Sequence, residues 1–277
     1  MRTVAIAGLG AIGADLARAL DRGAGKPGEA ERAGVDGLRL MAVAARDPVR
    51  AARVLAGFAD PPALVSLAAL AEADIVVEAT PAAVFDAVAG PAIAAGRVLV
   101  VCSAGALLSR MGLVDAARAS GARIVVPTGA LLGLDAVRAA AEGVVASVTI
   151  ETRKPPGGLA GAPYLVERGI DLAGILAPVL VFRGNAYDAA AGFPANVNVA
   201  AALALAGVRT ERTQVEIWAD QGVTRNTHTV RVEADSARLT MTIENVPSEA
   251  NPRTGKITAL SVLACLRGLS SPLKVGS

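Results

Sequence analysis

The sequence predicts an α/β fold, with an N-terminal Rossmann-type doubly wound parallel sheet and a second α+β domain that contains an antiparallel or mixed sheet. Three observations lead to this prediction. Short β-branched runs alternate with Ala- and Leu-rich stretches through the first half of the chain. A glycine-rich turn follows the first of these runs. Beyond about residue 130 the strands alternate between polar and apolar residues, which is typical of a sheet with one solvated face.

Length and composition indicate two domains. The chain has 277 residues, of which 53% are hydrophobic and only 3% aromatic. A core of Ala, Val, Leu and Ile fits helices packed on parallel strands better than it fits an all-β sandwich. We expect a dinucleotide-binding domain over 1–128, with a C-terminal helix within 252–277 packing back on it. A catalytic domain over 129–251 completes the prediction.

The first half supplies most of the predicted parallel sheet. A polar, Gly-rich insertion at 23–34 interrupts it and is expected to form a loop. Strands are predicted over 3–7, 38–45, 73–80, 97–104 and 122–128, and helices over 11–20 and 47–57.

The order of predicted helices and strands changes in the second half of the chain. A helix over 132–143 and a strand over 144–154 precede a Pro/Gly-rich segment and a region that we read as helical pieces. The last predicted helix is apolar and starts near Thr254. Three closely spaced strands are predicted before it, over 213–220, 226–234 and 237–245.

Charge and hydropathy exclude several partners. The net charge is +2 and the basic residues are scattered, so we expect no nucleic-acid partner. The mean hydropathy is +0.49, but the longest apolar stretches, 98–108 and 172–182, are too short to cross a bilayer, so we expect no membrane association. The N-terminus enters a strand directly without an export signal, which predicts a cytoplasmic protein.

Cysteine and histidine usage argues against a metal site. The two cysteines, Cys102 and Cys265, lie far apart in apolar runs and are expected to be buried free thiols. With one histidine and no cysteine pair, no metal site is predicted.

The glycine turn predicts a dinucleotide site. TVAIAGLGAIGADLARAL places Gly8, Gly10 and Gly13 in G-x-G-x-x-G spacing between a strand and a helix, with Ala11 and Ile12 inside the turn. Such a turn lets backbone approach a pyrophosphate, which the helix N-terminus then faces. The alternative is a merely tight strand–helix turn. The expected cofactor is NAD or NADP.

The ends of the next strands supply further cofactor candidates. Arg46 could stack on the adenine or pair with a phosphate, and a solvent-exposed arginine is the alternative. Because an arginine tolerates a ribose 2′-phosphate and the adjacent Asp47 suits a 2′-hydroxyl, this mixed signal predicts use of both cofactors. Thr80, Pro81 and Ala104 follow strands at the edge where the ribose or nicotinamide would pass.

The only histidine, His228, lies in the strand NTHTV on the same face as Val230 and Val232. Packing into the sheet is the simpler interpretation of a lone imidazole. Histidine is also the side chain whose ordinary pKa suits proton transfer near pH 7.

Several motifs together resemble the L-aspartate dehydrogenase family. They are GLGAIG, PTGALLGLDAVRAA at 127–140, TRKPP at 152–156, FPANVNVAAALALAG at 193–207, NTHTV at 226–230 and NVPSEANPRTGKIT at 245–258. The resemblance implies NAD(P)-dependent interconversion of L-aspartate and iminoaspartate, which hydrolyses to oxaloacetate and ammonia, with a role in pyridine nucleotide biosynthesis. It also implies cofactor contacts at Ala130 and Asn198, with Asn196 as an alternative to Asn198, and His228 as the active-site residue.

Cationic and polar residues that could bind the substrate carboxylates lie within two of these motifs. Arg153 and Lys154 precede a proline pair, and Thr254 and Lys256, with Arg253, flank the start of the last helix. A solvated strand end and simple helix capping are the alternatives. Two other functions stay open: a dehydrogenase of another amino or oxo acid, and a nucleotide-sensing protein without catalysis. The apolar second sheet suggests a homodimer.

Overall fold

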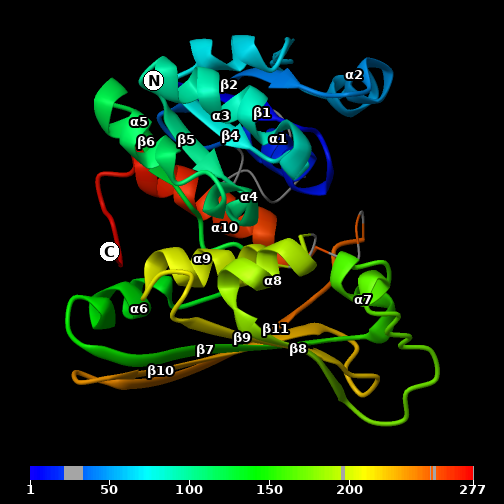
Figure 1. The fold of residues 1–277 in the computed structure, drawn as a ribbon. Coiled ribbons are helices and arrows are strands. Elements are labelled where there is room, and N and C mark those ends of the chain that lie inside the picture. The colour runs from blue at the N-terminus through cyan, green and yellow to red at the C-terminus, as the bar shows by residue number, and fades with distance from the viewer. Residues whose placement is uncertain (22–33, 195–196, 250, 252–253, 277) are drawn as a thin grey trace. The chain divides into compact units, whose positions relative to one another are not determined.

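A computed structural model describes residues 1–21, 34–194, 197–249, 251 and 254–276, which form two compact units (Figure 1). The first unit comprises Met1–Ser103, Arg110–Pro127 and Thr258–Ser277, and the second comprises Ala104–Ser109 and Thr128–Ile257. The insertion predicted as a loop falls almost wholly outside the described residues.

The first unit is built on a parallel sheet of six strands in the order β3-β2-β1-β4-β5-β6. The chain crosses from β3 to β4 at the opposite side of β1, which makes the sheet doubly wound and confirms the predicted Rossmann-type fold. The strands are β1 (Arg2–Ala7), β2 (Leu38–Ala44), β3 (Ala63–Leu64), β4 (Ile75–Glu78), β5 (Val98–Val101) and β6 (Arg123–Val125).

Helices cover this sheet and complete its core. Ile6 of β1, Leu16 of the first helix and Val43 of β2 are fully buried together with Val262 and Leu266 near the C-terminus. The C-terminal helix therefore contributes apolar side chains to the first unit. The helices are α1 (Ala11–Leu20), α2 (Pro48–Leu55), α3 (Phe85–Ala94), α5 (Gly112–Ser120) and α10 (Lys256–Ser270), with short 3₁₀ turns η2 (Ala68–Glu72) and η3 (Ala82–Val84).

The second unit contains a mixed sheet in the order β11-β10-β7-β9-β8. β7 pairs in parallel with β9, and the other neighbours are antiparallel. The elements are α4 (Ala104–Leu108), α6 (Leu134–Ala141), β7 (Val145–Lys154), η4 (Pro156–Gly158), α7 (Pro163–Glu167), β8 (Val179–Asn185), α8 (Ala186–Gly192), α9 (Asn198–Ala206), β9 (Thr213–Ala219), β10 (Asn226–Ala234) and β11 (Arg238–Asn245). Figure 1 shows α6, α8 and α9 on one face of this sheet.

Strict alternation along β10 and β11 decides what faces those helices. Val230 and Val232 of β10 are buried, whereas Thr240 and Thr242 of β11 are exposed. A strand with period-two patterning places alternate side chains on opposite faces. One face of the sheet is therefore apolar and covered by helices, and the other carries hydroxyl and charged groups.

One sequence prediction in the second half was wrong. The stretch read as helical pieces contains β8, because an apolar run of this length fits a buried helix and a strand equally well. The last helix begins at Lys256, close to the predicted start near Thr254, which itself belongs to a loop closed by a bridge between Pro247 and Gly255. In the described part of the chain, no helix is long and apolar enough to cross a membrane.

Candidate active site

The glycine turn of the first unit has the close approaches that its spacing predicts. Gly8 has φ of +93°, and a Cβ there would lie 2.5 Å from the carbonyl oxygen of Ala79 on the neighbouring strand end. A Cβ on Gly13 would overlap the carbonyl oxygen of Gly8, so α1 packs directly on the turn. Open space lies beside Gly10, which leaves the N-terminus of α1 accessible to an anion.

A cavity of about 630 Å³ opens in front of this turn. Its wall includes Gly8, Gly10, Arg46, Thr80 and Pro81, five of the residues that the sequence singled out. The backbone cradle and the helix N-terminus suit a pyrophosphate, and the cavity is the right size for part of a dinucleotide. Ala11 and Ile12 form the first turn of α1 beside it.

The β2–α2 junction places Arg46 and Asp47 in different local roles. Asp47 caps α2, because its carboxylate accepts a hydrogen bond of 3.0 Å from the backbone N–H of Arg50. Arg46 is exposed and lines the cavity, and so does Arg50, which the sequence analysis missed. The cavity wall therefore offers two guanidinium groups and an acid already used as a helix cap.

A buried carboxylate joins the two strand ends on the other side of the cavity. Glu78, the last residue of β4, is 0% exposed. Its oxygens accept hydrogen bonds from the backbone N–H and hydroxyl of Thr80, at 2.8 and 2.7 Å, and from those of Ser103, at 3.0 and 3.1 Å. Glu78 was missed by sequence analysis, although its place at the end of a buried strand could have drawn attention to it.

In the second unit, Asn198 lies where two helices begin. Its Oδ1 accepts a hydrogen bond of 3.0 Å from the backbone N–H of Gly105, next to Ala104 in α4. The structure thus brings Ala104 and Asn198 together, although they are far apart in the sequence. Asn196 lies outside the described residues.

Ala130 is held by an asparagine that the sequence analysis did not single out. Its carbonyl oxygen accepts a hydrogen bond of 3.0 Å from Nδ2 of Asn245, the last residue of β11. The Oδ1 of Asn245 is buried and has no hydrogen-bond partner among the described residues. Asn245 thereby fixes the loop that carries Ala130.

His228 is buried on the helix-covered face of the second sheet, with 2% of its surface exposed. It lies directly opposite Thr152 of β7, and its Nδ1 is 3.0 Å from the Thr152 hydroxyl oxygen. This hydrogen bond orients the ring. It does not involve Nε2, the other ring nitrogen. Burial, and then the nearby charge of Lys154, lower the pKa of His228 to about 3, so the imidazole is neutral at neutral pH.

The two cations of TRKPP lie on opposite faces of β7. Lys154 is buried on the same face as Thr152, and burial lowers its pKa to about 8. Arg153 is on the other face, where it forms ion pairs with Glu151 at 2.6 Å and Asp220 at 3.0 Å. The geometry therefore brings Lys154, but not Arg153, to the side of the sheet that carries His228.

Two protein-family models together match most of this chain. Residues 8–127 match the family described as "Homoserine dehydrogenase, NAD binding domain", and residues 135–269 match "Aspartate dehydrogenase, C-terminal". The L-aspartate dehydrogenase of Bradyrhizobium diazoefficiens is 53% identical over 275 residues, which cover 99% of this chain and 94% of that protein. The chain belongs to the L-aspartate dehydrogenase family.

Other members of the L-aspartate dehydrogenase family match over the same extent. L-aspartate dehydrogenase 3 of Bordetella bronchiseptica is 52% identical, with 99% of this chain and 97% of that protein covered. The crystal structure of aspartate dehydrogenase from Thermotoga maritima has a TM-score of 0.71 and 24% identity, with both chains covered completely, and so shares the fold. The family and the NAD-binding domain identify an oxidoreductase that uses NAD or NADP.

The remaining substrate candidates form other contacts at the start of α10 and in the loop before it. Lys256 forms an exposed ion pair of 2.8 Å with Glu249. The hydroxyl oxygen of Thr254 accepts a hydrogen bond of 3.1 Å from Nδ2 of Asn251. These contacts stabilise the loop and give no support to carboxylate binding by Thr254 or Lys256. Arg253 lies outside the described residues.

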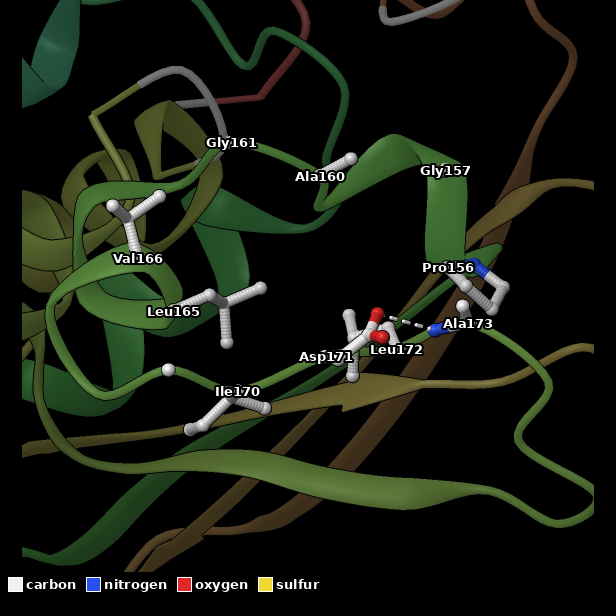
Figure 2. Close-up of a pocket in the computed structure, with 11 residues that line it drawn as sticks. Pro156, Gly157, Ala160, Gly161, Leu165, Val166, Ile170, Asp171, Leu172 and Ala173 are labelled. Carbon is white, nitrogen blue, oxygen red and sulfur yellow. Dashed lines mark hydrogen bonds between the residues drawn. The ribbon is translucent and has the colours of Figure 1, made fainter.

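A second cavity, of about 480 Å³, lies between η4 and the segment after α7 (Figure 2). Leu165, Ile170 and Leu172 make much of its wall, and its one charged lining group is Asp171, whose Oδ1 accepts a hydrogen bond of 2.9 Å from the backbone N–H of Ala173. A carboxylate in an apolar wall repels an anionic ligand, so this cavity does not suit a dicarboxylic substrate of an L-aspartate dehydrogenase. Among the described residues, no group of three or more His, Cys, Asp or Glu side chains is placed to hold a metal ion.

Proposed function

We propose that the protein is an NAD(P)-dependent L-aspartate dehydrogenase, which oxidises L-aspartate to iminoaspartate, released as oxaloacetate and ammonia, and catalyses the reverse reductive amination. The observation that carries the proposal is the similarity over nearly the full length to two proteins named L-aspartate dehydrogenase. The glycine cradle of the first unit supports the cofactor part of the proposal, and His228 supports the catalytic part.

The residues of the first unit are proposed to bind the dinucleotide. Gly8, Gly10 and Gly13, with Ala11 and Ile12, would hold the pyrophosphate at the start of α1. Arg46 and Arg50 would contact the adenosine ribose, where a 2′-phosphate carries negative charge. The further cofactor contacts are proposed at Thr80, Pro81, Ala104, Ala130 and Asn198. When bound, the nicotinamide takes up the hydride from the substrate Cα.

His228 is proposed to serve the steps at the reacting carbon. A neutral imidazole held by Thr152 can exchange a proton through Nε2 with the water or hydroxyl group on this carbon. Lys154 supplies positive charge on the same face, which favours a dicarboxylate and disfavours a cationic ligand. Arg153, Thr254 and Lys256 stay predictions without geometric support.

The domain division, the location, the oligomeric state and the metabolic role are broader proposals that rest on the family and on the sequence. We infer that 1–128 with 252–277 forms the dinucleotide-binding domain and 129–251 the catalytic domain, which is close to the division into two units. A cytoplasmic location and a homodimer would fit an enzyme that supplies iminoaspartate to pyridine nucleotide biosynthesis.

The substrate proposal is tested by following absorbance at 340 nm with L-aspartate and either NAD⁺ or NADP⁺. L-Aspartate is expected to be oxidised far faster than L-alanine, which lacks the second carboxylate. The matched control is L-alanine at the same concentration and pH. Equal turnover of the two amino acids would contradict a site built for a dicarboxylate.

A further inference from the structure

Lys154 and His228 are neighbours across the central strands of the second sheet. Thr152 of β7 lies directly opposite His228 of β10, and Lys154 follows Thr152 by two positions on the same face. In an antiparallel pair such diagonal neighbours are roughly 7–8 Å apart at their backbones, within reach of a long side chain. Lys154 therefore shares the buried surface around the imidazole.

The residue type at this position is unusual for the chain. The sequence contains 23 arginines and 4 lysines. Among the described residues, Lys154 is the only buried lysine or arginine, with 5% of its surface exposed. Arginine keeps its charge under all ordinary conditions, whereas a buried lysine can lose its proton. The one buried cation in the described part of the chain is thus of the type that can exchange a proton.

Three charged residues lie close to Lys154 in the sheet, and one of them, the buried Asp220 after β9, forms an ion pair with Arg153. The charged side chains next to it along β7, Glu151 and Arg153, lie on the opposite face. α9 has no titratable side chain. The titratable residues that the other helices of this unit bring are all exposed, namely Asp135, Arg138, Tyr187, Asp188, Glu167 and Arg168, apart from the half-buried Tyr164.

Burial lowers the pKa of both Lys154 and His228, but only Lys154 still titrates near neutral pH. It lowers the pKa of Lys154 to about 8, so both protonation states are accessible there. It lowers the pKa of His228 to about 3, so near neutral pH the imidazole can take up a proton only transiently. Between pH 7 and 9, Lys154 is the group of this pair that can store a proton.

We propose that Lys154 is the catalytic base that activates the amino group in the L-aspartate oxidation proposed above, on which this inference rests. The neutral Nζ accepts one proton from the substrate α-ammonium group and becomes an ammonium itself. The freed amine lone pair forms the C=N bond as the hydride leaves Cα for the cofactor. In reductive amination Lys154 returns this proton to the nitrogen, while neutral His228 serves the reacting carbon.

The decisive variant is Lys154→Arg, which keeps the positive charge but cannot act as a base. If Lys154 is the base, kcat is expected to fall by about 10²- to 10⁴-fold. The rise of kcat with pH that reports its deprotonation should disappear, while KM for L-aspartate changes little. Lys274→Arg makes the same change at an exposed lysine and should leave kcat and its pH profile unaltered.

A second variant distinguishes loss of the base from loss of folding as the cause of a low kcat. Lys154→Ala removes the base and leaves room for a small primary amine, so added ethylamine should restore part of the lost kcat. The same amine should leave the wild-type rate unchanged. Melting temperature and NADH binding, measured on each preparation, show whether the protein is folded.

The proton can also be followed without turnover. In protein labelled with ¹³C-lysine, only four side chains contribute signals, and the one lost in Lys154→Arg identifies Lys154. That signal should titrate near pH 8 rather than above pH 10. A Lys154→Arg enzyme with wild-type kcat and pH profile, or a Lys154 signal that titrates above pH 10, would overturn the inference. A wild-type protein inactive with L-aspartate would instead defeat the proposed function.

Discussion

His228 shows how burial changes the task that a side chain can perform. With its pKa lowered to about 3, the imidazole is a neutral hydrogen-bonding group at neutral pH and cannot be a store of positive charge. The ordinary pKa of histidine predicts an ionisation near pH 7, and burial moves this ionisation to acidic pH. Its contact with Thr152 is consistent instead with a precisely oriented, uncharged proton-transfer group.

Replacing His228 by Ala is expected to lower kcat by about 10²- to 10⁴-fold, because the proton-transfer group at the reacting carbon is lost. NADH binding should be retained, since the glycine cradle belongs to the first unit. The measurement combines kcat, NADH titration and melting temperature on one preparation. Thr229→Ala, next in the strand and on the other face, is the matched control. A folded His228→Ala protein with near-normal kcat would mean that the imidazole only packs.

At the scale of elements, the β2–α2 junction is where we propose that the adenosine ribose binds. Asp47 is occupied as the cap of α2, whereas Arg46 and Arg50 line the cavity. Use of both cofactors is expected, with the two arginines responsible for tolerance of the 2′-phosphate.

Arg46→Asp should therefore weaken NADPH binding by roughly 10- to 100-fold, the equivalent of a charge-assisted hydrogen bond of about 1.5–3 kcal/mol. NADH binding should change much less, because NADH has a 2′-hydroxyl in place of the phosphate. Fluorescence titration of both cofactors measures the difference. Arg53→Asp, on the exposed side of α2, controls for the change in net charge. Equal weakening for both cofactors would show that Arg46 does not read the phosphate.

The elements of the first unit were predictable because their signals are local. A buried parallel strand is a short β-branched run, and the glycine spacing follows from contacts within a few residues of the turn. β1 and α1 accordingly begin and end within one residue of their predicted bounds. β8 was missed because its pairing with β9 is a long-range contact that leaves no periodic pattern in an apolar run.

The candidate site was predictable in its residue types but not in its geometry. The motif TRKPP names Arg153 and Lys154 together, and only the register of β7 against β10 shows which of them faces His228. Thr152 and Asn245 were missed for a similar reason. Their contacts with His228 and Ala130 join residues 76 and 115 positions apart, which no local pattern encodes.

At the scale of the whole molecule, the buried polar groups of the second unit should reduce stability. Lys154 is charged in the folded protein at neutral pH, yet it lies in a region where water is largely excluded. The folded-state pKa of about 8 is below the ordinary value of 10.5, so folding disfavours the proton. A shift of this size corresponds to a cost on the order of 3 kcal/mol at neutral pH.

The variant Lys154→Met is therefore expected to unfold at a higher temperature than the wild type at pH 7, because an apolar chain of similar length replaces a buried charge. Between about pH 8 and 10.5 the unfolded wild-type chain binds the lysine proton and the folded one does not, so wild-type stability rises with pH. The difference in stability between Lys154→Met and the wild type should therefore shrink between about pH 8 and 10.5, and it should be smallest above pH 10.5. Urea unfolding at a series of pH values measures this difference, with Lys274→Met as the control at an exposed site. A variant less stable than wild type at pH 7, or a difference independent of pH, would show that Lys154 is stabilised in its charged form by the folded protein.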